Sequence, residues 1–173
     1  MPSEYNIPFV GLKNGLHSFD FTIEKTFFET LDYFDFSKVD IRVNLELTKK
    51  EQLLELHFYG HGTVEVPCDI STELFDLPIE TQMQMIVKFG SAFESPSEEI
   101  MILPHGTYQI DVTQQIYEMI ILAVPQKKIH PQVADGTLKS AILDKLKLLA
   151  PKEQNTSTND QTDPRWDQLK KLL

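Results

Sequence analysis

Hydrophobic and polar residues alternate over two long stretches of the chain. The alternation covers residues 41–47, turns at residues 49–51 and returns over residues 54–66. A period of two places successive side chains on opposite faces of a strand, so this pattern predicts a long β-hairpin. Gly60 and Gly62 interrupt the returning strand and indicate a bulge or a bend, because glycine adds no side-chain packing.

Shorter alternating stretches predict further strands. Residues 7–10 and 16–23 flank the pair Asn14-Gly15, which favours a tight turn, so we expect the chain to open with a hairpin. Residues 81–89 predict another strand. Weaker strand patterns lie at residues 99–103 and 107–112.

Apolar residues at a spacing of three to four predict helices. Residues 24–34 predict a short helix that covers the sheet, and residues 114–123 predict a helix that Thr113 caps. Residues 126–136 are polar and predict a loop, and residues 137–149 predict another helix with one apolar stripe. The expected fold class is α+β: a twisted antiparallel β-sheet or a partly closed barrel, with two or three covering helices and a tethered C-terminal helix.

The C-terminal part of the chain predicts a tether and a short helix. Residues 151–163 contain no apolar residue except Pro151, so we expect a flexible polar linker with a root-mean-square span of roughly 20 Å. Asp163 at the N-cap and Pro164 at the first helical position begin an amphipathic stretch over residues 164–173. The predicted organisation is therefore one domain over residues 1–150, the linker and this helix.

The predicted C-terminal helix needs a surface to pack on, because about ten residues form only a marginal helix in water. It either folds back onto its own domain or serves as a tethered ligand for a partner groove or an RNA–protein surface. The sequence alone leaves both alternatives open.

Composition and charge narrow the function classes. The 173 residues include 41% hydrophobic residues, which suits one globular domain, and the net charge of −10 excludes a general nucleic-acid coating protein. Residues 1–120 carry 7 basic and 20 acidic side chains, a balance of −13, whereas residues 121–173 carry 9 basic and 6 acidic, a balance of +3. Any contact with RNA or a partner is therefore expected in the last third. The candidate residues are Lys127, Lys128, Lys139, Lys145, Lys147, Arg165, Trp166, Leu169, Lys170 and Lys171.

Motifs for catalysis and for membrane insertion are absent from the sequence. It contains no phosphate loop, nucleophile elbow, zinc-protease or dinucleotide motif, so we expect neither an enzyme nor a cofactor. The longest strictly apolar run, residues 119–124, is too short to cross a bilayer, and no signal peptide is recognisable at the start. Cys68 is the single cysteine, which suits the reducing cytoplasm. It is expected to be a small half-buried side chain rather than a nucleophile.

Three segments resemble one protein family. Asp163-Pro164-Arg165-Trp166 with Leu169 resembles the terminal Asp-Pro-Arg-Trp-x-x-Leu signature of the YceD family, the large ribosomal RNA subunit accumulation proteins, in a Bacteroidetes-like bacterial version. Residues 110–125 and 62–69 look like two further segments of that family, in the expected order. The resemblance implies a role in the accumulation of large-subunit ribosomal RNA and no established catalytic activity.

The cysteines depart from the pattern of that family. Many members carry cysteine pairs that could bind a metal, whereas here Cys68 stands alone and Ser71 takes the place of its usual partner. A mixed metal site could in principle combine Cys68 with His57, His61 and His130. Lone histidines near strand bends, however, are more often solvated or hydrogen-bonded side chains. Because a zinc site needs four soft or imidazole ligands, we expect no metal.

The resemblance implies a non-catalytic ribosome-biogenesis factor. Its expected partner is the large-subunit precursor, the RNA of that precursor or a ribosomal protein. Two alternatives remain: a β-barrel that carries a small apolar ligand, because such sheets can close around a cavity, and a protein-only adaptor whose acidic body meets a basic protein.

Overall fold

Six strands form the main sheet of the structure, a computed structural model that describes residues 3–97, 99–138 and 140–150. The strand order is β2-β3-β4-β5-β7-β6, and every pairing is antiparallel except that of β5 with β7. The sheet is open, and strands hold 48% of the residues against 21% in helices, which confirms the predicted α+β class. The strands are β2 (Gly15–Glu24), β3 (Lys38–Lys49), β4 (Leu53–Pro67), β5 (Leu74–Gly90), β6 (Glu94–Ser97) and β7 (Ile100–Pro104).

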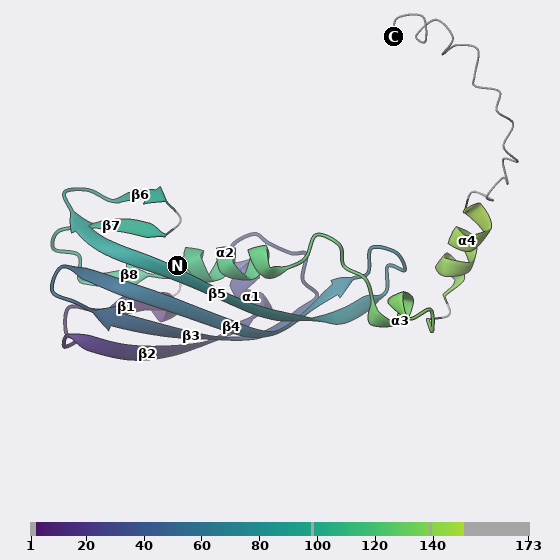
Figure 1. The fold of residues 1–173 in the computed structure, drawn as a ribbon, viewed down its shortest axis with the longest axis horizontal. Helices are drawn as coiled ribbons and strands as arrows, with labels where there is room; N and C mark the ends of the chain where they lie inside the picture. The colour runs from purple at the N-terminus through teal and green to yellow at the C-terminus, as the bar shows by residue number, and fades with distance from the viewer. Residues whose placement is uncertain (1–2, 98, 139, 151–173) are drawn as a thin grey trace, which may run out of the picture. The chain divides into compact units, whose positions relative to one another are not determined.

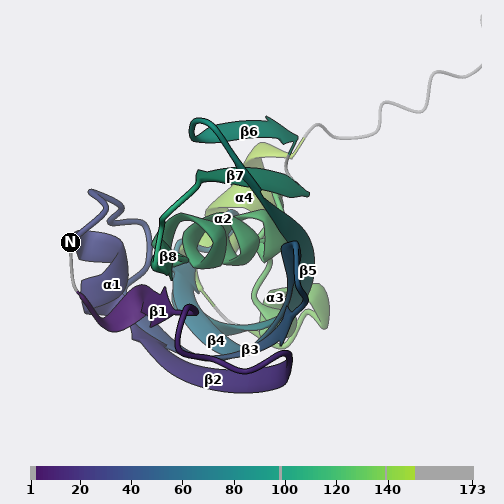
Figure 2. The ribbon, with the colours of Figure 1, turned by 90° about the vertical axis from the view of Figure 1, so that its left-hand side faces the viewer.

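The alternating residues of β3 and β4 build the inner face of this sheet. Ile41, Val43, Leu45 and Leu47 are buried, and the register pairs Leu45 with Phe58. The long predicted hairpin is therefore confirmed. Figures 1 and 2 show α2 (Thr113–Ala123) on the inner side, with the sheet curving around it from β2 to β5.

The opening hairpin was predicted wrongly. β1 (Asn6–Pro8) pairs with β8 (Gln109–Asp111) in a separate two-stranded sheet, and Gly15 pairs with Lys49 instead of with the first strand. Beyond Pro8 the chain loops away, and the Lys49 ammonium donates hydrogen bonds to the carbonyl oxygens of Phe9 at 2.9 Å and Leu12 at 2.8 Å. A charged side chain thus satisfies loop carbonyls that a hairpin would have paired with N–H groups.

The helices differ from the predicted ones at their ends. α1 (Lys25–Glu29) is shorter than predicted, and η1 (Ser3–Tyr5) and α3 (Pro131–Ala134) are short helices, the latter within the predicted loop. Thr113 does not cap α2: it is the first helical residue, and its N–H donates to Asp111 Oδ1 at 2.9 Å. The carboxylate of Asp111 is therefore the capping group.

Gly60 and Gly62 cause no bulge, because the registers of β4 with β3 and with β5 run through both without a shift. A Cβ atom at Gly62 would lie 2.1 Å from the carbonyl oxygen of Asp40 on β3. A Cβ atom at Gly60 would lie 3.1 Å from Cε of Met119 on α2. The two glycines are thus needed for close approach by a neighbouring strand and by the helix.

Contacts between Cα atoms divide the chain into two compact units, Met1–Leu138 and Lys139–Leu173. The described part of the second unit contains α4 (Ala141–Leu149), whose N-cap Ser140 accepts a hydrogen bond from the N–H of Ile142. The predicted linker and C-terminal helix lie outside the described residues, and the domain division proposed from the sequence stays a prediction. None of the helices in the described ranges has the length and apolar character needed to cross a membrane.

Candidate partner-binding surface

Two of the predicted contact residues are neighbours in one loop of the first unit. Lys127 and Lys128 lie in the loop between α2 and α3, with Lys127 exposed and Lys128 partly buried. Lys145 is exposed on α4, and Lys147 is a position of the same helix. The remaining candidates lie outside the described residues: Lys139, Arg165, Trp166, Leu169, Lys170 and Lys171.

The lysine loop is fixed to the turn that follows β4. Asp69 and Lys128 exchange two hydrogen bonds: the N–H of Lys128 donates to Asp69 Oδ2 at 2.6 Å, and the N–H of Asp69 donates to the Lys128 carbonyl oxygen at 2.8 Å. Two residues after Lys128, the ring of His130 packs against the ring of Phe75 on β5, with centroids 5.3 Å apart. The backbone at Lys128 is therefore joined to the turn after β4.

Cys68 directly precedes Asp69 of this junction. Its side chain is buried, whereas the sequence led us to expect a half-buried one. Its Sγ accepts hydrogen bonds from the N–H groups of His130 at 3.3 Å and Ser71 at 3.5 Å. Burial raises the pKa of the thiol, but these N–H groups, that of Ile70 and the Ser71 hydroxyl together lower it more, from 9.0 to about 7. Since the sulfur is enclosed, its role in this geometry is to accept hydrogen bonds that join the two loops.

The residues near Cys68 do not fit a metal site. Across the described ranges, no group of three or more His, Cys, Asp and Glu side chains is arranged to hold an ion. His57 and His61 lie four residues apart on β4, about 13 Å at about 3.3 Å per residue, whereas two ligands of one zinc ion lie within about 4 Å of each other. At Cys68, backbone N–H groups surround the sulfur where a metal would need further ligands.

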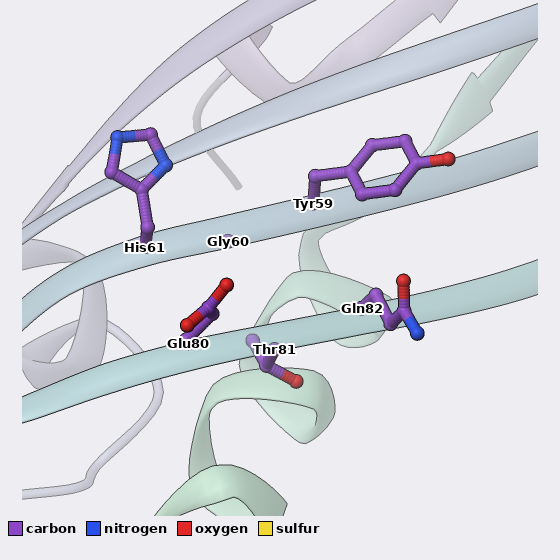
Figure 3. A pocket seen from close by; sticks show the side chains of 6 residues that line it. All are labelled: Tyr59, Gly60, His61, Glu80, Thr81 and Gln82. Atoms are coloured by element: carbon purple, nitrogen blue, oxygen red, sulfur yellow. The ribbon is translucent and has the colours of Figure 1, made fainter.

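A shallow polar hollow lies on the outer face of the sheet (Figure 3). Gly60 faces α2, so its neighbours Tyr59 and His61 point to the opposite face, where they lie beside Gln82 and Glu80 of β5. Thr81 points inward, and its hydroxyl donates to the Met119 carbonyl oxygen at 3.4 Å. The hollow offers polar groups for contact but no nucleophile paired with a base.

Sequence reasoning did not identify this hollow or the Asp69–Lys128 junction. Both depend on residues that are distant in the chain: Tyr59 meets Gln82 through strand register, and Asp69 meets Lys128 across two loops. The alternation in the sequence does indicate which polar residues lie on the outer face of the sheet. It does not indicate which residue of the next strand lies beside each of them.

Comparison with known proteins identifies a protein family that matches the chain. The family model described as "Large ribosomal RNA subunit accumulation protein YceD" matches residues 56–173, which is more than half of the chain. The matched region begins within β4 and includes the Cys68 turn, α2 and the lysine loop. Searches among curated proteins and among solved structures gave no match.

Proposed function

Because the chain belongs to the YceD family of large ribosomal RNA subunit accumulation proteins, we propose that it is a non-catalytic ribosome-biogenesis factor. It acts in the cytoplasm on the precursor of the large subunit and supports the accumulation or maturation of its RNA. The single observation that carries this proposal is the family match over residues 56–173.

The charge distribution supports a local contact in the last third of the chain. Residues 1–120 have a balance of −13 and repel phosphate, whereas residues 121–173 have a balance of +3. We propose Lys127 and Lys128 of the lysine loop as contact residues for RNA or an acidic partner surface. The matched region also contains Arg165, Trp166, Leu169, Lys170 and Lys171, which we propose as further contact residues.

The alternative of a β-barrel carrier for an apolar ligand has less support. The sheet is open, and its inner face packs against α2 through buried residues such as Ile116 and Ile120. A carrier of that kind needs an enclosed space that these side chains occupy.

Sedimentation through ribosomal gradients tests the proposed function. The full chain is compared with a chain that ends at Pro151 and with the double variant Lys127→Glu, Lys128→Glu. We expect the full chain to travel with large-subunit particles and one or both altered chains to be depleted from them. The variant Lys13→Glu, Lys25→Glu reverses as many charges at other sites and should travel as the full chain does. Failure of the full chain to associate with any ribosomal particle would overturn the proposal.

A further inference from the structure

An open groove of about 940 Å³ lies between α2 and the strands β5 and β7. Its lining is mainly apolar and includes Met83, Met101, Leu103, Tyr117 and Ile121. This groove is separate from the Cys68 junction and from the lysine loop, since no residue of either lines it.

Two exposed side chains extend the apolar surface at the groove. Leu122 on α2 is 80% exposed and Phe93 is 61% exposed, and both belong to its lining. Large apolar side chains that gather at a groove mark a binding surface more often than scattered ones do.

Methionine makes this groove suited to a peptide partner. Three of the five methionines in the sequence line it: Met83 is partly buried, and Met85 and Met101 are buried core residues. The flexible thioether side chain adapts to differently shaped apolar side chains, and methionine is abundant on surfaces that bind amphipathic helices.

The charged side chains that line the groove and the adjoining hollow are all acidic. Asp111 and Glu118 are its charged lining residues, and Glu80 and Glu99 line the adjoining hollow that shares Met83 and Leu122. No lysine or arginine lines either of them within the described ranges. Charge complementarity therefore favours an occupant with basic side chains flanking its apolar ones.

We propose that this groove binds a basic amphipathic segment of a protein. The inference rests on the proposed function and deepens it, because proteins that bind ribosomal RNA carry basic segments to neutralise phosphate. The apolar side chains of the segment fill the methionine-lined groove, and its lysines and arginines face Asp111, Glu118 and Glu99.

Two synthetic amphipathic peptides with the same apolar face, one lysine-rich and one glutamate-rich, test the chemistry on the full chain by fluorescence anisotropy. We expect the lysine-rich peptide to bind at least about ten-fold more tightly. The variant Leu122→Lys should weaken its binding about ten-fold. The control Leu16→Lys adds the same charge at a 63% exposed position of β2 and should have no comparable effect. Equal binding of both peptides, or equal effects of the two variants, would overturn the inference.

A photo-cross-linking amino acid at Phe93 of the full chain identifies the occupant in cells. We expect cross-links to a basic protein that disappear with Leu122→Lys. Cross-links only to RNA, to a second copy or to the chain itself would overturn the inference. If they do so while the protein still travels with large-subunit particles, the proposed function stands and the groove assignment alone fails.

Discussion

Single glycines fix how closely the central strands approach one another and α2. At Gly62 a Cβ atom would meet the backbone of Asp40, which cannot move without displacing β3. At Gly60 it would meet the ends of the Thr81 and Met119 side chains, which can shift by a few tenths of an ångström. The two positions therefore differ in tolerance although they lie on the same strand.

We expect Gly62→Ala to lower the free energy of unfolding by about 3 kcal/mol, and Gly60→Ala by about 1 kcal/mol. Urea denaturation of both variants measures the difference. Equal losses at the two sites would contradict the distinction between a backbone neighbour and flexible side chains.

The Cys68 thiol should make stability depend on pH. Its pKa in the folded chain, about 7, lies below the ordinary value of 9.0 because N–H groups stabilise the thiolate. A lowered pKa contributes stability that is fully present above pH 9 and is lost as the pH falls through 7. The advantage of the native protein over Cys68→Ala in urea denaturation should therefore grow between pH 7 and pH 9. A difference that stays constant over this range would contradict the thiolate assignment.

At the scale of elements, the Asp69–Lys128 junction joins the turn after β4 to the loop after α2. Asp69→Ala removes the acceptor of the 2.6 Å hydrogen bond and should cost about 1 kcal/mol of unfolding free energy. Asp69→Asn retains a carbonyl acceptor and is the matched control. Faster hydrogen exchange at the Lys128 amide in the alanine variant would be the local readout. Unchanged exchange there would mean that this hydrogen bond does not fix the lysine loop.

Elements whose pattern is local were predictable from the sequence. The β3–β4 hairpin follows from alternation around one turn, and α2 from a single apolar stripe. The pairing of β1 with β8 was not predictable, because Asn14-Gly15 is a strong local turn signal while the partner strand lies about a hundred residues away. Local rules give the period and the turns, but tertiary packing selects among distant partners.

The candidate site was predictable in its charges and not in its geometry. Lys127 and Lys128 follow from the basic excess after residue 120. Their fixation by Asp69 and the methionine-lined groove depend on residues that come together only in the folded chain.

At the scale of the whole molecule, the charge asymmetry gives a prediction about salt. If Lys127 and Lys128 neutralise phosphates, association with ribosomal RNA weakens as salt rises, and Lys127→Gln, Lys128→Gln should lower the logarithmic salt slope by about 2. Filter binding to large-subunit RNA over a range of potassium chloride measures the slope. Lys13→Gln, Lys25→Gln removes two charges elsewhere and should leave it unchanged. If neither double variant changes the salt slope, the phosphate contact does not involve Lys127 and Lys128.

The pairing of β1 with β8 also determines the order in which the strands can pair during synthesis. Asp111, the partner of Asn6, is added to the growing chain about 5 to 20 s after Asn6 at ordinary elongation rates. β3, β4 and β5 meanwhile each follow in sequence the strand with which they pair. Residues 6–8 can therefore pair only after β8 has been synthesised, and their amides should be the last of the described strand amides to gain protection from exchange.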